Sequence, residues 1–168
     1  LVLKRNGRGR ENTFVWKGLE DIEIGDRVVT LKSMNGRQAA FRFPQTERVK
    51  RGDYKVNRLN EVNLPIESDP DIMKYLGIFV GDGWRRRIRP EVGFALPAGK
   101  KARNILLDLH QKVFESKISA DKDYVYINFV FLANFIDTLS LGQGAKNKNI
   151  PGWVFTLPKE QKEAFVEG

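Results

Sequence analysis

The sequence predicts an α+β fold in which helices and pairs of strands alternate along the chain. Between residues 68 and 142, apolar residues recur in turn at helical and at strand spacing, and glycine, proline and aspartate turns separate these runs. Residues 1–31 differ, because short β-like runs broken by glycine turns are typical of a small all-β piece. We therefore predict a β-rich segment with a connection over residues 1–60 and an α+β domain over residues 61–168.

The first predicted helix of the α+β domain begins at residues 68–71, Ser-Asp-Pro-Asp. Aspartate can cap the free amide groups, proline is tolerated at the first helical position, and a second aspartate complements the helix dipole. The helical pattern stops at residues 81–83, Gly-Asp-Gly. The later elements are strands at 84–89 and 91–96, a helix at 100–116, strands at 118–120 and 124–130, a helix at 132–139, and a helical pattern opening at Pro158. From the first helix to residue 139 the order is therefore α-β-β-α-β-β-α.

Composition excludes several classes of protein. The sequence has no cysteine and one histidine, His110, so disulfides, thiolate metal sites and a histidine zinc site are not expected. No apolar run approaches the ~20 residues that cross a bilayer, so we expect no membrane span, and the first residues lack the core of a secretory signal. These absences predict an intracellular protein, and a first residue that is Leu1 suggests a piece excised from a longer chain.

The charge is strongly basic and unevenly distributed. The net charge is +8, and the two basic blocks are residues 1–58, at +7, and residues 85–103, at +6. Such a balance favours a polyanionic partner, either a nucleic acid or an acidic membrane surface.

Asp82 lies where the first helix ends, so its carboxylate adds to the negative end of the helix dipole. A divalent cation would compensate both charges, and magnesium takes oxygen ligands such as the carboxylate of Asp82 and the free carbonyl of Gly81. Gly77 and Gly81 are four residues apart, so they share a helix face on which a second helix could approach closely. The alternative is that residues 81–83 are only a glycine cap followed by a turn.

Arginines dominate the second basic block. If residues 84–89 form one strand, Arg85, Arg87 and Arg89 share one of its faces, and Arg86 points to the other. In the major groove such a face could meet guanine edges or phosphates, although a solvated basic edge would carry the same pattern. Lys100, Lys101 and Arg103 near the next helix start are candidate phosphate contacts.

Residues 75–83, Tyr-Leu-Gly-Ile-Phe-Val-Gly-Asp-Gly, resemble the LAGLIDADG motif in the form found in inteins. The predicted order of elements also resembles half of that family's fold, whose antiparallel sheet is saddle-shaped. This resemblance implies a homing endonuclease that cuts double-stranded DNA with Mg2+, and it makes Asp82 a metal ligand and a catalytic residue. It further implies a partner, a second LAGLIDADG half supplied by a missing C-terminal part or by a second chain.

Two further segments carry the resemblance. Residues 144–158 resemble the family segment that leads into the second motif helix, in which a lysine before Ile-Pro is thought to assist cleavage. That match makes Lys148 a second catalytic candidate, although alone it would be a solvated lysine near a turn. Residues 164–168 resemble the start of the second helix without its acidic end.

The N-terminal region resembles part of the Hint splicing fold of inteins, over residues 1–5 and 16–31. A splicing intein needs a nucleophilic first residue, an early catalytic histidine and a C-terminal asparagine followed by a nucleophile. The sequence has Leu1, no histidine before His110, and Gly168 at its end, so we expect a module truncated at both ends that does not splice as it stands. His110 itself is expected to be a packed or solvated histidine within a helix.

The function predicted from these features is site-specific hydrolysis of both strands of a long DNA target, with the strands at 84–96 and 118–130 reading the groove. Two alternatives remain open at the level of sequence. One is a DNA-binding module of the same fold that no longer cuts. The other is a remnant of a protein-splicing element.

Overall fold

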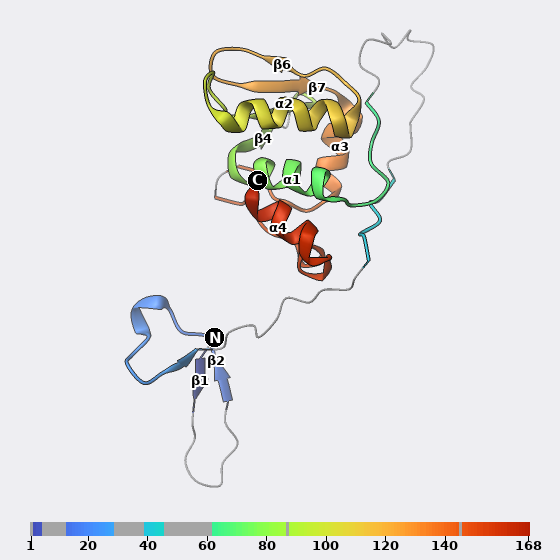
Figure 1. The fold of residues 1–168 in the computed structure, drawn as a ribbon. Coiled ribbons are helices and arrows are strands. Elements are labelled where there is room, and N and C mark those ends of the chain that lie inside the picture. The colour runs from blue at the N-terminus through green and yellow to red at the C-terminus, as the bar shows by residue number, and fades with distance from the viewer. Residues whose placement is uncertain (1, 5–12, 29–38, 46–61, 87, 145) are drawn as a thin grey trace. The chain divides into compact units, whose positions relative to one another are not determined.

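The protein divides into two compact units, Leu1–Met34 and Asn35–Gly168. The structure, a computed structural model, describes residues 2–4, 13–28, 39–45, 62–86, 88–144 and 146–168 (Figure 1). None of the helices in these described ranges is long and apolar enough to cross a bilayer.

The first unit contains a small antiparallel sheet. Its strands are β1 (Val2–Lys4), β2 (Thr13–Val15) and β3 (Arg27–Val28), in the order β2-β1-β3, and a short 3-10 helix, η1 (Leu19–Asp21), lies between β2 and β3. The ammonium of Lys17 lies 2.8 Å from the carboxylate of Asp26, which also accepts a hydrogen bond from the amide of Glu23 in the turn before β3. These described strands lie in the part of the chain for which the sequence predicts short β runs.

The second unit opens with the helix α1 (Pro70–Asp82). The carboxylate of Asp69 caps it by accepting hydrogen bonds from the amides of Asp71 and Ile72, and Pro70 occupies the first helical turn, as the sequence predicts. The apolar face of α1 is fully buried and supplies the centre of the core, with Ile72, Met73, Tyr75, Leu76 and Phe79.

A four-stranded sheet follows, with every neighbouring pair antiparallel and the strand order β4-β5-β7-β6. Its strands are β4 (Gly83–Arg85), β5 (Glu91–Phe94), β6 (Ser119–Ala120) and β7 (Val125–Asn128). The other helices are α2 (Lys101–Phe114), α3 (Val130–Thr138) and α4 (Lys159–Glu167), with a 3-10 helix, η3 (Gly152–Thr156), before α4. The predicted α+β class is confirmed, and the described elements from α1 to α3 follow the order α-β-β-α-β-β-α.

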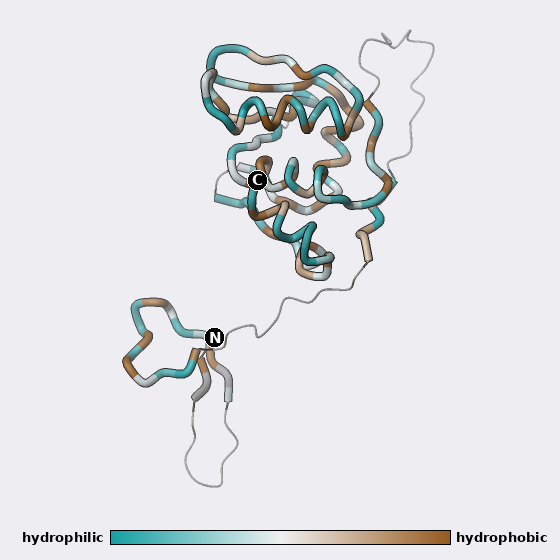
Figure 2. Tube along the Cα trace, in the orientation of Figure 1, coloured by the Kyte–Doolittle hydropathy of each residue, from teal (hydrophilic) through white to brown (hydrophobic). Residues whose placement is uncertain are grey.

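The helices cover one face of this sheet. Val92 and Phe94 of β5, together with Val125 and Ile127 of β7, belong to the same core cluster as α1 and α2. Hydrophobic and hydrophilic residues alternate in bands along α1 and α2 (Figure 2), so each helix turns its apolar side to that core. Because side chains alternate along a strand, the residues between these four point to the opposite, uncovered face.

Residues 41–43, which were expected to belong to the N-terminal segment, are part of the second unit. The amide of Phe43 donates to the carbonyl of Ile66, and the ring of Phe43 lies edge-on to that of Phe135 at 5.2 Å between centroids. Phe41 stacks on Trp153 at 4.4 Å. The weak periodicity of this segment did not predict that Phe41 and Phe43 pack against the second unit's aromatic residues. The boundary predicted near residue 60 lies outside the described residues.

His110 is fully buried in the core. Its Nδ1 atom lies 3.2 Å from the hydroxyl of Tyr75, and its Nε2 atom lies 3.0 Å from the hydroxyl of Ser116. Burial lowers the pKa of His110 to about 4, and burial also raises the pKa of Tyr75. His110 is thus a neutral, hydrogen-bonded core residue, which agrees with the packed alternative expected from the sequence.

Candidate functional site

The C-terminal end of α1 is the first candidate site. Gly81 and Asp82 are exposed there, while Gly83 is buried and the chain enters β4 without an intervening loop. A Cβ atom at Gly83 would overlap Phe79, so only glycine permits this direct passage from helix to strand. The carboxylate of Asp82 is therefore presented at the junction of the helix and the sheet.

Lys148 lies at the same helix end. Its ammonium donates to the carbonyl of Phe79 at 3.1 Å and to the carbonyl of Gly81 at 2.9 Å, although it is 67 residues further along the chain than Gly81. Partial burial lowers the pKa of Lys148, and the negative charge of Asp82 opposes that shift. The fold thus brings together Asp82 and Lys148, the two catalytic candidates predicted from the sequence.

The residues present fit a magnesium ion through one protein carboxylate. Within the described ranges there is no group of three or more histidine, cysteine, aspartate or glutamate side chains that could hold a metal. Magnesium commonly takes one or two carboxylates and completes its shell with water and phosphate oxygens, so Asp82 meets that requirement. The carbonyl of Gly81, predicted as a further ligand, already accepts a hydrogen bond from the ammonium of Lys148.

Gly77 and Gly81 differ in their surroundings. Gly77 is buried against α4, and a Cβ atom there would overlap the carbonyl oxygen of Phe165. In the same way, a Cβ atom at Gly168 would overlap the carbonyl oxygen of Lys74. At Gly81 the nearest such atom is the carbonyl oxygen of Gly168 at 4.0 Å. The two helices thus approach closely at Gly77, whereas a Cβ atom at Gly81 could be accommodated without overlap.

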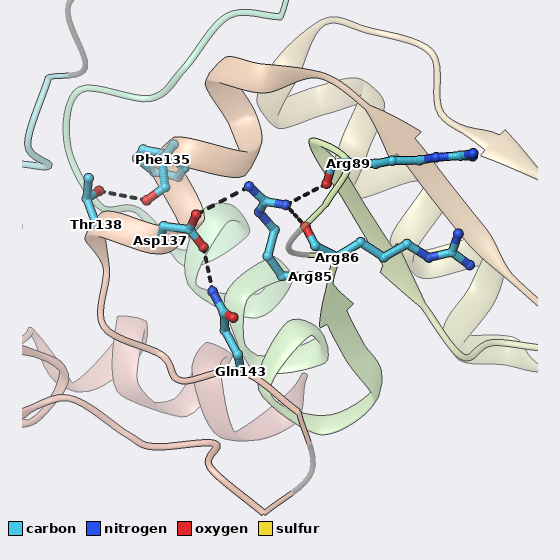
Figure 3. Close-up of polar contacts among 7 residues, drawn as sticks. All are labelled: Arg85, Arg86, Arg89, Phe135, Asp137, Thr138 and Gln143. Atoms are coloured by element: carbon cyan, nitrogen blue, oxygen red, sulfur yellow. Dashed lines mark hydrogen bonds and ion pairs between the residues drawn. The ribbon is translucent and has the colours of Figure 1, made fainter.

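Arg85 lies on the covered face of the sheet. It is paired across the strands with Val92, which is fully buried, and its guanidinium lies 3.4 Å from the carboxylate of Asp137 on α3. The same guanidinium donates to the carbonyls of Arg86 and Arg89 (Figure 3). Only 9% of the side chain is exposed. Arg85 would have to leave these partners to reach DNA.

The strand that was predicted to carry the arginines is shorter than expected. β4 ends at Arg85, although the amide of Arg86 still donates to the carbonyl of Glu91, and residues 88–89 form a bend in which the amide of Glu91 donates to the carbonyl of Arg89. The alternation that would have aligned Arg85, Arg87 and Arg89 therefore stops, and Arg87 itself lies outside the described residues. Figure 3 shows the side chains of Arg86 and Arg89 extending together, away from that of Arg85.

The uncovered face of the sheet forms a shallow hollow. The register pairs Trp84 with Gly93 and Gly93 with Tyr126, so all three positions lie on this face. Arg86 and Arg89 also line the hollow, together with Glu91, Asp121, Tyr124 and Asn128. Aromatic rings, two arginines and an amide are groups that can contact bases and phosphates. Sequence reasoning missed Trp84, Glu91, Tyr126 and Asn128, because only the strand register shows which face is open.

The three basic residues near the start of α2 are not equivalent. Lys100 and Lys101 are exposed, so they remain available for a phosphate contact. The guanidinium of Arg103 instead donates to the carbonyls of Leu96, Asp121 and Lys122, which fastens the turn before β7 to the start of α2. Arg103 therefore has a structural role within the described fold.

Comparison with known proteins shows where this chain has relatives. No family model matches the sequence. The whole chain is 25% identical to part of an iron-sulfur cluster assembly SufBD family protein from Mycobacterium leprae, of which it covers 19%. It is 30% identical over 127 residues to a DNA polymerase from Thermococcus kodakarensis, a match that covers 69% of the chain and 7% of the polymerase. It is also 26% identical to a DNA polymerase from Thermococcus sp. strain GE8, over 86% of the chain and 9% of the polymerase. The chain thus spans less than a fifth of each of these relatives.

Proposed function

We propose that this chain is part of an intein-encoded LAGLIDADG homing endonuclease that hydrolyses both strands of a DNA target with magnesium. The observation that carries the proposal is the convergence of Lys148 and Asp82 at the end of α1. Neither residue is exceptional alone, and the two lie in different segments, residues 75–83 and 144–158, that resemble this family.

The packing of α1 supports the proposal. Members of the family pair two motif helices side by side, and here α4 packs against α1 with close approaches at Gly77 of α1 and at Gly168, which directly follows α4. The segments involved, residues 75–83 and 164–168, are those that resemble the first and second motif helices. The order of the described elements and the antiparallel sheet agree with a half-domain of that family.

The pattern of relatives supports an intein. An intein is a segment that interrupts a host protein, so its relatives should occur within hosts of unlike function. Here the chain matches small parts of a SufBD family protein and of two DNA polymerases, whose printed names share no function. Matches confined to a small part of such unlike proteins are what an inserted module predicts.

In the proposed reaction the carboxylate of Asp82 would hold the metal. A magnesium ion there would supply positive charge next to the scissile phosphate and would lower the pKa of a water molecule. Lys148 lies beside Asp82, where its ammonium can stabilise negative charge on a phosphate oxygen. A second carboxylate comes from a second LAGLIDADG half, whether from further polypeptide or from a second chain, and double-stranded DNA is the substrate.

A selection on a randomised DNA duplex library in the presence of magnesium tests this function. The parent protein, supplied with its second half, should enrich one cut sequence, and Asp82→Asn should bind the same sequence without cutting it. Asp108→Asn is a matched control, because Asp108 is an exposed carboxylate on α2. Sequence-specific binding without nicking by the parent would instead support a module that no longer cuts, and no enrichment of any kind would refute both.

A further inference from the structure

The register of the sheet places Arg86 on the uncovered face. The pairs Trp84 with Gly93 and Arg85 with Val92 define two opposite faces of β4, and the amide of Arg86 continues the ladder by donating to the carbonyl of Glu91 at 3.1 Å. Glu91 in turn is paired with Asn128 of β7. Arg86, Glu91 and Asn128 therefore form one row across the open face.

The guanidinium of Arg86 is held on two sides. Its Nε atom lies 3.0 Å from the carboxylate of Glu91, whose side chain is only 8% exposed. Its central carbon lies 5.2 Å from the centroid of the Trp84 ring, in cation–π contact. Trp84 is itself seated over Gly93, where a Cβ atom would overlap the indole, and it lies edge-on to Tyr124.

This arrangement leaves the two terminal nitrogens of the Arg86 guanidinium available for a ligand. The ion pair uses Nε, and the side chain of Arg86 is still 58% exposed. A guanidinium presents two terminal nitrogens in a planar fork, and two parallel donors match the O6 and N7 acceptors of guanine in the major groove. An arginine already held by a carboxylate and an aromatic ring loses less conformational freedom when it binds.

Four other described cations of residues 85–103 are less suited to reading a base. Arg85 and Arg103 already donate to backbone carbonyls, and Arg85 also pairs with a carboxylate. Lys100 and Lys101 carry ammonium groups, which bind phosphate as point charges and cannot form a planar pair of bonds. Arg86 thus combines exposure, a planar donor pair and a fixed orientation.

We propose that Arg86 is a specificity-determining residue that recognises one guanine in the DNA target, and that Glu91 is a positioning residue that orients it. The inference rests on the proposed function, because it presumes that the open face of the sheet meets a DNA groove. On that face Arg86 makes the proposed contact, whereas the sequence predicted contacts by Arg85, Arg87 and Arg89.

Binding preferences measured with a randomised duplex library, without divalent metal so that no strand is cut, test this assignment. The full 168-residue chain should enrich a guanine at one base pair. Arg86→Lys keeps the charge and removes the planar donor pair, so discrimination at that base pair should fall about tenfold or more while the other positions are unchanged. Glu91→Gln should weaken the same preference to a smaller extent.

Arg89→Lys is the matched control, since Arg89 lines the same hollow and has the same substitution. It should lower affinity evenly across sequences without removing the preference for one base. Thermal unfolding of each variant would separate a lost contact from a lost fold. Loss of the guanine preference in Arg89→Lys with its retention in Arg86→Lys would overturn the assignment and leave the endonuclease proposal standing. Failure of the parent chain to prefer any DNA sequence would overturn both.

Discussion

Lys148 donates to two carbonyl groups at the end of α1, and one of them, that of Phe79, also accepts the hydrogen bond from the amide of Gly83. The last carbonyls of a helix have no intrahelical donors, and they carry the negative end of the helix dipole. The ammonium of Lys148 bonds to the carbonyls of Phe79 and Gly81, directly before the exposed carboxylate of Asp82. One side chain therefore both caps the helix and places positive charge next to the proposed metal ligand.

Replacing Lys148 should accordingly affect stability as well as cleavage. In Lys148→Met the two hydrogen bonds are lost, so the free energy of unfolding should fall by about 1–2 kcal/mol. Urea denaturation measures this change, and Lys146→Met, at an exposed position on the same loop, is the control. Equal stability of the two variants would show that the contacts of Lys148 contribute nothing to the fold.

His110 should make the fold sensitive to acid. Its folded pKa of about 4 lies below the ordinary value of 6.5, so the unfolded chain binds the proton more readily than the folded chain does. The contribution to stability is complete above about pH 6.5 and is lost as the pH falls through the folded pKa. The loss amounts to at most about 3 kcal/mol.

Comparison with His110→Gln isolates this contribution from that of the carboxylates, because glutamine does not titrate and can still hydrogen-bond to Tyr75. The free energy of unfolding of the variant, measured from pH 7 to pH 4, should decline less steeply than that of the parent. Parallel declines would contradict a neutral His110 in the core.

At the scale of elements, the contact between α1 and α4 depends on two residues without side chains. Gly77 meets the backbone of Phe165, and Gly168 meets the backbone of Lys74 and Ile78. Because the opposing atoms belong to the backbone, they cannot move aside as a flexible side chain could. The salt bridge between Lys74 and Glu167, at 3.0 Å, lies on the exposed rim of the same contact and contributes little.

Gly77→Ala and Gly81→Ala should therefore have opposite effects. Alanine at Gly77 forces α1 and α4 apart and should lower the free energy of unfolding by about 1–3 kcal/mol. Alanine at Gly81 meets an atom only at 4.0 Å and should be neutral or stabilising by up to about 1 kcal/mol, since alanine favours the helix. Thermal unfolding of the two variants compares them directly, and an equal loss in both would rule out close approach at Gly77 as the cause.

The strand pairing also decides which arginines can serve as contacts. Side chains alternate along β4, so Arg85 and Trp84 lie on opposite faces of the sheet. This alternation does not by itself show which of the two faces the helices cover. The buried partner of Arg85, Val92, and the ion pair with Asp137 assign Arg85 to the covered side. The uncovered face of the sheet accordingly carries Trp84 and Arg86.

For the whole molecule, the division into two units predicts independent folding. Seven of the 29 basic residues and five of the 21 acidic residues lie in Leu1–Met34, so Asn35–Gly168 retains a net charge of +6. A protein consisting of residues 35–168 should unfold with the same midpoint as the corresponding transition of the full chain. A midpoint lowered by several degrees would show that the first unit stabilises the second.

The whole molecule should also cut DNA poorly without its second half. The sequence contains one complete motif helix, with Asp82 as its acidic end, and paired metal sites act on both the attacking and the leaving oxygen of a phosphodiester. Cleavage of a plasmid carrying the selected target should therefore appear only when the second half is added. Robust magnesium-dependent double-strand cleavage by a monomer of the 168 residues would contradict this prediction.

The sequence by itself determined the α+β class, the succession of helices and strands from Pro70 onward, and the position of Asp82 at a helix end. These features depend on local periodicity and on capping residues such as Asp69, which act within a few residues of the chain. Only the tertiary structure decided that Lys148 meets Gly81, that Phe43 packs on Phe135, and that Arg85 faces α3 while Arg86 faces outward. Such contacts join residues distant in sequence, and they follow from strand register and helix packing, which local patterns do not specify.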